Sequence, residues 1–119
     1  WNAVRDNDGY MHVTIDKPGA SVNAFSASVL EELDTLLTEI ERARDIKGVI
    51  FKSGKPGNFI AGADIKEMSS ITTKDQARGT AKKGQDLFAR LERLPIPTVA
   101  AISGSCLGGG LEFAMACKY

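Results

Sequence analysis

The chain has 119 residues, of which 43% are hydrophobic and 25% are charged, as expected for one globular domain. Its 15 Lys and Arg residues balance its 15 Asp and Glu residues, so the chain has no net positive charge to support non-specific binding of nucleic acid. No apolar run approaches the roughly 20 residues of a membrane-spanning helix, and two cysteines cannot build a disulfide framework, so both thiols are expected to be reduced in a reducing compartment.

A β-hairpin is predicted at the start of the chain, where residues 2–5 and 10–16 form strands around a turn at residues 6–9. The second strand alternates apolar and polar residues, which is typical of a half-buried strand. His12 lies on its polar face, and we expect this strand at a sheet edge. With no second histidine, neither a metal site nor a nucleophilic triad is expected at His12. Trp1 stands where an initiator methionine is expected, which suggests that the natural protein begins earlier.

A helix is predicted after a loop at residues 17–25, which contains Pro, Gly and Asn. Ser28 and Glu31 have the spacing of a capping box, and the helix is expected to run to about Arg44. A short buried strand follows at residues 48–51. The apolar residues of the helix recur at helical spacing: Val29, Leu30, Leu33, Leu36, Leu37 and Ile40.

A second, longer amphipathic helix is predicted to begin at another capping box, formed by Thr73 and Gln76. Pro95 and Pro97 end it, and residues 98–102 are the next expected buried strand. The alternation of strands and helices predicts an α/β fold with parallel strand pairing. One face of the long helix carries Ala77, Ala81, Gly84, Phe88 and Leu91.

Two glycine-centred segments follow apolar runs that we expect to be buried strands: residues 60–66, IAGADIK, and residues 104–112, GSCLGGGLE. Each leads into an expected helix, where backbone N–H groups are free in a loop or first helical turn. Two such donors directed at one carbonyl oxygen would form an oxyanion hole, with Glu112 beside it. The second of these helices is expected to continue to the end of the chain, near Tyr119.

Each segment, taken alone, also has a purely structural interpretation. Triple glycine can let a helix pack closely on a sheet, with Glu112 complementing the helix dipole. Asp64 can cap a short helix, with Lys66 either solvated or acting as a point charge for a phosphate. Neither segment matches a phosphate-binding P-loop or the Gly-x-Gly-x-x-Gly dinucleotide pattern.

The two segments together resemble the crotonase (enoyl-CoA hydratase/isomerase) superfamily. The resemblance lies in residues 59–68, FIAGADIKEM, and residues 97–114, PTVAAISGSCLGGGLEFA, and extends over nearly the whole chain, including the loop at residues 22–25. Within the superfamily the sequence looks closest to the hydratase half of the multifunctional fatty-acid oxidation α-subunit. The implied fold is α/β, the crotonase-like ββα superhelix. Residues 1–119 would be the N-terminal part of a single domain, incomplete at its C-terminus.

The resemblance also implies site residues. In this superfamily two backbone N–H groups polarise a thioester carbonyl, and the motifs place them at Ala63 and Gly109. Glu112 matches one of the two glutamates with which the hydratases add water, and would be a general base. The second glutamate would lie beyond Tyr119. The implied coenzyme A site, with Lys66 near the phosphates, consists of Ala61, Gly62, Ala63, Asp64, Ile65, Lys66, Gly108 and Gly109.

The implied activity is that of an enoyl-CoA hydratase in fatty-acid β-oxidation, with a coenzyme A thioester as substrate and no permanently bound cofactor or metal. The implied partners are further copies in a trimer-type homo-oligomer or a fatty-acid oxidation complex, in the bacterial cytoplasm or the mitochondrial matrix. Two alternatives stay open: another crotonase reaction, such as isomerisation or thioester hydrolysis, and a non-catalytic acyl-CoA-binding or assembly module. Residues 1–119 alone are expected to have little or no activity.

Overall fold

Four strands form the main sheet of the computed structural model, which describes all 119 residues. β1 (Asn2–Arg5) and β2 (Tyr10–Ile15) form the predicted hairpin. β2 then pairs in parallel with β3 (Gly48–Ser53), and β3 pairs in parallel with β5 (Thr98–Ala101). The strand order is therefore β1-β2-β3-β5, and the predicted parallel pairing is confirmed.

β2 is an inner strand of this sheet, so the expectation that it lies at an edge is wrong. The reason is that the hairpin folds β1 onto the side of β2 that β3 leaves open. His12 Nε2 lies 2.8 Å from Asp6 Oδ2 at the hairpin turn, where Asp6 Oδ1 also accepts the backbone N–H groups of Asp8 and Tyr10 at 2.9 Å. His12 therefore belongs to the turn of the hairpin.

A second, two-stranded sheet is formed by β4 (Asn58–Ile60) and β6 (Ser105–Cys106), which pair in parallel. β6 lies within the second glycine segment, and β4 ends where the first one starts. β4 is the buried strand expected before the first glycine segment, whereas β6, with two residues, is too short for alternation of polarity to mark it in a sequence. They bring the two glycine segments side by side.

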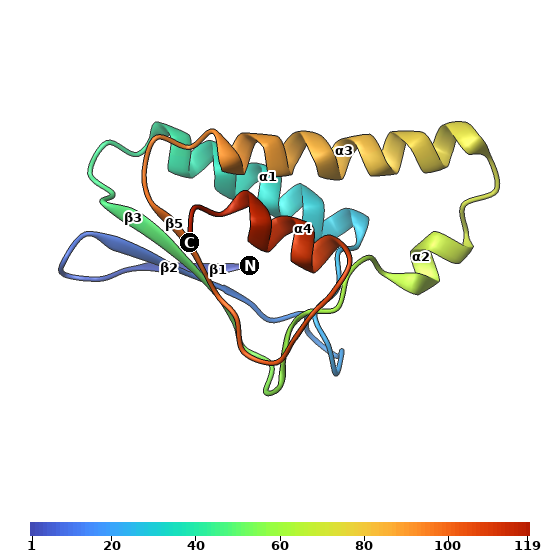
Figure 1. Ribbon diagram of the computed structural model, residues 1–119, viewed down its shortest axis with the longest axis horizontal. Coiled ribbons are helices and arrows are strands. Elements are labelled where there is room, and N and C mark those ends of the chain that lie inside the picture. The colour runs from blue at the N-terminus through green and yellow to red at the C-terminus, as the bar shows by residue number, and fades with distance from the viewer.

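The helices are α1 (Ala27–Arg42), α2 (Ile65–Ser69), α3 (Lys74–Glu92) and α4 (Gly109–Ala116). Figure 1 shows α1, α3 and α4 on one side of the main sheet, with the long α3 above the other two and the short α2 below its N-terminal end. No helix is both long enough and apolar enough to cross a membrane.

The predicted N-terminal cap is wrong for α1 and is confirmed for α3. Ser26, not Ser28, caps α1, because the Ser26 Oγ accepts the N–H of Val29 at 3.3 Å while the Ser28 hydroxyl lies 3.0 Å from the Ser26 Oγ. For α3 the predicted capping box is confirmed in both directions. Gln76 N donates to Thr73 Oγ1 at 3.2 Å, and Thr73 N donates to Gln76 Oε1 at 3.3 Å.

The predicted extension of the last helix to Tyr119 is wrong, since α4 ends at Ala116. Beyond it Tyr119 N donates to Thr98 O at 3.0 Å, and Ala100 N donates to Tyr119 O at 2.8 Å. This is the bonding of a parallel bridge to β5. The open edge of β5 offers unpaired backbone groups, and these take the end of the chain out of the helix.

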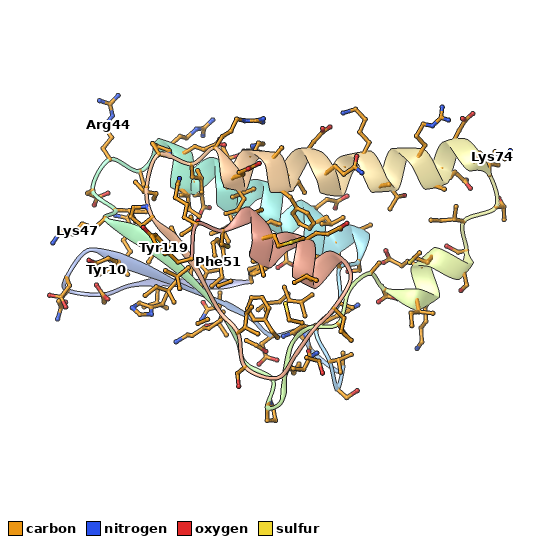
Figure 2. All side chains as sticks on the ribbon, in the orientation of Figure 1. Tyr10, Arg44, Lys47, Phe51, Lys74 and Tyr119 are labelled. Carbon is orange, nitrogen blue, oxygen red and sulfur yellow. The ribbon has the colours of Figure 1, made fainter.

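The core is centred on Phe113 of α4, which is fully buried. Its ring lies 5.0 Å from that of Phe51 in an edge-to-face contact, and 5.6, 5.8 and 5.9 Å from those of Trp1, Phe88 and Phe25. Figure 2 shows Phe51 in the middle of the molecule, between sheet and helices. The predicted apolar stripe of α1 is confirmed, because all its members are buried in this core: Val29, Leu30, Leu33, Leu36, Leu37 and Ile40.

Residues 57–62 and 104–110 meet backbone to backbone along what we call the glycine seam. A Cβ placed on Gly110 would lie 2.3 Å from the carbonyl oxygen of Ile60, and one on Gly104, whose φ is +79°, would lie 2.1 Å from the backbone of residue 57. Side chains at these two positions are excluded by the closeness of the neighbouring backbone. The seam therefore sets how closely α4 approaches β4.

We expect Gly110→Ala to lower the free energy of unfolding by about 2 kcal/mol, because the added methyl group overlaps the Ile60 carbonyl and the seam must open. Gly109→Ala is the matched control, since its Cβ makes only an ordinary 3.4 Å contact with Phe25 and should change stability by less than about 1 kcal/mol. Urea denaturation of the protein carrying each change measures both. Equal losses of unfolding free energy for the two variants would contradict the close backbone approach at Gly110.

Candidate functional site

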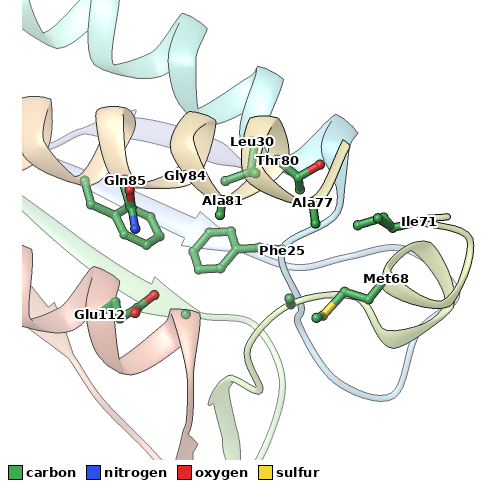
Figure 3. A pocket seen from close by; sticks show the side chains of 13 residues that line it. Phe25, Leu30, Met68, Ile71, Ala77, Thr80, Ala81, Gly84, Gln85 and Glu112 are labelled. Atoms are coloured by element: carbon green, nitrogen blue, oxygen red, sulfur yellow. The ribbon is translucent and has the colours of Figure 1, made fainter. Parts of the chain in front are cut away.

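A cavity of about 290 Å³ lies between α3 and the two glycine segments. Its lining is mostly apolar, and it includes three residues that the sequence predicted to be catalytic: Ala63, Gly109 and Glu112. Figure 3 shows Phe25 in the middle of this cavity, with α3 above it and Glu112 of α4 below. The fold thus brings together residues that are almost 50 positions apart in the chain.

The N–H group of Ala63 is free because of how Phe25 is held. Phe25 and Ala63 form an isolated parallel bridge, in which Phe25 N donates to Gly62 O and Asp64 N donates to Phe25 O, both at 2.8 Å. A parallel bridge uses the residues on either side of the bridged one. The N–H of Ala63 itself is directed away from Phe25 and has no acceptor in the chain.

The N–H group of Gly109 is free for a different reason. Gly109 is the first residue of α4, so its N–H has no acceptor one turn earlier within the helix. Of the donors that follow, Gly110 N donates to Leu107 O at 2.9 Å and Glu112 N donates to Gly108 O at 3.0 Å. The N–H of Gly109 has no acceptor in the chain.

The two free donors lie on adjoining segments. Gly62 has a φ of +102°, and a Cβ placed on it would lie 3.3 Å from Leu107 O and 3.8 Å from Gly109 N. Only a residue without a side chain allows this approach at that φ. Both unpaired N–H groups thus belong to one cavity, and an oxyanion hole needs two such donors directed at one oxygen.

Glu112 lies in the first turn of α4, next to the buried Phe113 that anchors the helix. Its Oε2 atom lies 3.9 Å from the position that a Cβ of Gly109 would occupy, so the carboxylate is beside one of the free donors. The carboxylate has no hydrogen bond or ion pair within the chain and is exposed to the cavity. It is therefore available as a proton acceptor for a molecule bound there.

Asp64 has the structural role that the sequence left open. Its Oδ1 accepts the N–H groups of Lys66 and Glu67 at 3.0 and 3.3 Å as the N-cap of α2, and its Oδ2 accepts Lys17 Nζ at 2.7 Å. The hydrogen bond from Lys17 and the N–H of Glu67 hold the pKa of the Asp64 carboxyl below its ordinary value. Its side chain is fully used within the chain, whereas the exposed Lys66 ammonium has no ion pair.

Only two of the predicted coenzyme A-binding residues, Ala63 and Gly109, line the cavity. The others lie elsewhere on the two glycine segments, and their predicted role stays a prediction. They are Ala61, Gly62, Asp64, Ile65, Lys66 and Gly108.

Neither cysteine has the character of a nucleophile. Both are free thiols, and Cys117 is buried, which raises its pKa to about 12. Burial also raises the pKa of Cys106. No group of three or more His, Cys, Asp or Glu side chains is placed to hold a metal ion.

The sequence pattern alone does not single out two residues of the cavity, Phe25 and Gln85. Phe25 follows a loop and carries no periodic signal. Gln85 does have one, because it lies four residues after Ala81 and three before Phe88, at the border of the apolar face of α3. A polar residue at that border is the sequence signal that could have found it.

Comparison with known families finds a match over residues 5–119 to the model of the enoyl-CoA hydratase/isomerase family. Among curated proteins, the fatty acid oxidation complex subunit alpha of Idiomarina loihiensis is 52% identical over 114 residues, which are 96% of this chain and 16% of that protein. The subunit of the same name from Aliivibrio fischeri is 47% identical, over 97% of this chain and 17% of that protein.

Solved structures give the same picture. An enoyl-CoA hydratase from Bacillus anthracis superimposes with a TM-score of 0.89 and 30% identity, covering 100% of this chain and 46% of that one. An enoyl-CoA hydratase/carnithine racemase from Magnetospirillum magneticum also has a TM-score of 0.89 and 30% identity, over 98% of this chain and 43% of that one. The chain thus spans less than half of these structures and about one sixth of the curated relatives.

The ion pair of Asp64 with Lys17 makes stability depend on pH in a defined direction. Because the pKa of Asp64 is lowered in the folded state, the pair stabilises the fold above the unfolded value of about 4, and the effect is lost as the pH falls through the folded pKa. We expect Asp64→Asn, which keeps a capping oxygen, to be less stable than the parent protein at pH 7 but not at about pH 2. Urea denaturation at both pH values measures this, with Asp8→Asn as the control, because Asp8 forms no ion pair.

Proposed function

The chain belongs to the enoyl-CoA hydratase/isomerase family, and on that premise we propose that it supplies the acyl-CoA site, the oxyanion hole and one catalytic glutamate of an enoyl-CoA hydratase. The likeness to enoyl-CoA hydratase structures confirms the predicted crotonase-like α/β fold. One observation carries the proposal: the free N–H groups of Ala63 and Gly109 share a cavity with the unpaired carboxylate of Glu112.

In the proposed reaction the thioester carbonyl oxygen of a 2-enoyl-CoA accepts hydrogen bonds from the N–H groups of Ala63 and Gly109. Glu112 takes a proton from water, whose oxygen bonds to C3 of the substrate while the electron pair of the double bond moves toward C2 and the carbonyl oxygen. The two donors stabilise the negative charge on that oxygen. C2 then takes up a proton, for which the predicted second glutamate beyond Tyr119 is the candidate, and the product is a 3-hydroxyacyl-CoA.

Coenzyme A is proposed to lie along the two glycine segments. Ala63 and Gly109 of these segments line the cavity, and the unpaired, exposed ammonium of Lys66 is available for the phosphates as a point charge. The apolar part of the cavity, toward Met68 and Ile71, then accommodates the acyl chain. The names of the bacterial relatives support a role in fatty-acid β-oxidation in a bacterium, within a fatty-acid oxidation complex.

The position of Glu112 favours hydration over the other reactions considered. An isomerase moves a proton between substrate carbons and needs no water-activating carboxylate beside the oxyanion hole. A non-catalytic binding module would have no use for an unpaired carboxylate in a mostly apolar cavity, because such a group costs free energy when a ligand desolvates it. Thioester hydrolysis stays the second candidate, since it also uses activated water.

We expect Glu112→Gln, in the complete protein that contains this chain, to lower kcat for hydration of crotonyl-CoA by about 10²–10⁴-fold, because the amide cannot take the proton of water. KM should change little, since the thioester contacts are made by backbone groups. The matched control is Glu39→Gln on the exposed outer side of α1, which should leave kcat unchanged. Undiminished hydration by the Glu112→Gln protein would remove Glu112 from the mechanism.

The oxyanion hole can be tested by removing one backbone donor. Gly109 is the first helical residue, a position at which proline is tolerated although it has no N–H. We therefore expect Gly109→Pro to lower kcat by about 10²–10³-fold, as for the loss of one oxyanion-hole donor. Gly109→Ala keeps the N–H, and its Cβ meets Phe25 at an ordinary 3.4 Å, so it is the matched control. Steady-state kinetics with crotonyl-CoA decide, and equal activities of the two variants would argue against Gly109 as a donor.

A further inference from the structure

The cavity contains a second polar side chain without a partner, that of Gln85 on α3. Gln85 and Glu112 both line this cavity, and both also line a neighbouring hollow that includes Phe88 and Met115. Figure 3 shows Gln85 and Glu112 at the same end of the cavity, with Ile71 at the other. The cavity thus has one polar end, formed jointly by α3 and α4.

Only three polar side chains line the cavity: Thr80, Gln85 and Glu112. Thr80 Oγ1 is already used, because it donates to Gln76 O on its own helix at 3.1 Å. Neither the amide of Gln85 nor the carboxylate of Glu112 has a hydrogen bond or ion pair within the chain. The amide of Gln85 is therefore the one side-chain donor of the lining that is free to pair with the carboxylate.

The helix that carries Gln85 is held firmly over α1. Arg90, on the same helix, donates to Glu41 at 3.0 and 3.1 Å and to Thr38 Oγ1 at 3.1 Å, and also pairs with Asp34. Gln85 lies five residues before Arg90 on the same helix, so its backbone position is fixed while its side chain lines the cavity. The side chains of Gln85 and Glu112 are both exposed, and an exposed glutamate samples several rotamers unless a partner holds it.

We propose that Gln85 is a positioning residue: its side-chain N–H, which has no acceptor in the chain without substrate, donates a hydrogen bond to the Glu112 carboxylate when substrate is bound and holds it toward the water that adds to the substrate. The proposal rests on the proposed role of Glu112 as the general base. A hydrogen bond from an amide to a carboxylate is charge-assisted and therefore stronger than one between neutral groups. It leaves the second carboxylate oxygen free to accept the proton of water.

The test uses Gln85→Met in the complete protein, because methionine has nearly the length of glutamine but no donor. We expect kcat for crotonyl-CoA hydration to fall about tenfold while KM stays within about twofold, since the thioester contacts are unchanged. The matched control is Asp86→Asn. Asp86 is the neighbour of Gln85, but it pairs with Lys82 at 2.8 Å on the outer surface of α3, so its replacement should leave kcat unchanged.

A double-mutant cycle separates positioning from a general structural effect. In a Glu112→Asp background the carboxylate is withdrawn from Gln85, and Gln85→Met should then lower kcat by less than about twofold further. A tenfold loss in that background too, or a kcat of Gln85→Met within about twofold of the parent, would overturn the positioning role. Failure of the proposed function itself would give a different result, namely unchanged hydration activity of the Glu112→Gln protein.

Discussion

The close approach of two backbones along the glycine seam is the constraint on which the rest of the structure depends. Gly110 lies so near the carbonyl of Ile60 that no Cβ fits between them, and a Cβ on Gly62 would lie 3.3 Å from Leu107 O. This contact sets α4 against β4 and so determines where the N–H of Gly109 lies relative to that of Ala63. The fixed placement of donors before a ligand arrives is what gives an oxyanion hole its effect.

Phe25 connects this seam to the core. Its backbone forms the bridge that leaves the N–H of Ala63 free, and its ring lies against Gly109 and packs on Phe113. Phe113 is in turn the residue after Glu112, so the aromatic core holds the helix that presents the carboxylate. The carboxylate also lies in the first turn of α4, where the helix dipole favours a negative charge. Core packing and site geometry are therefore determined by the same few side chains.

The elements with a strong periodic pattern could be predicted from the sequence, and the cavity could not. The stripe of α1 and the capping box of α3 are read directly from residue spacing. β6 is too short for a pattern, and the choice between Ser26 and Ser28 as the cap depends on where the loop from Asn23 arrives. Asn23 itself is fully buried and its side-chain amide donates to three different oxygens, a role that long-range folding decides.

The predicted site residues show why a structural and a functional interpretation of the glycines are not exclusive. The proposed donors at Ala63 and Gly109 are backbone groups, so no side-chain type can mark them in the sequence. What the sequence records is the absence of side chains at Gly62 and Gly110, which lets the two segments approach. A glycine that permits close packing here also exposes the neighbouring N–H to the cavity. The only side chains with acid–base or hydrogen-bonding capacity left free in the lining are Glu112 and Gln85, and both lie on helices whose positions this packing and the α1–α3 ion pairs fix.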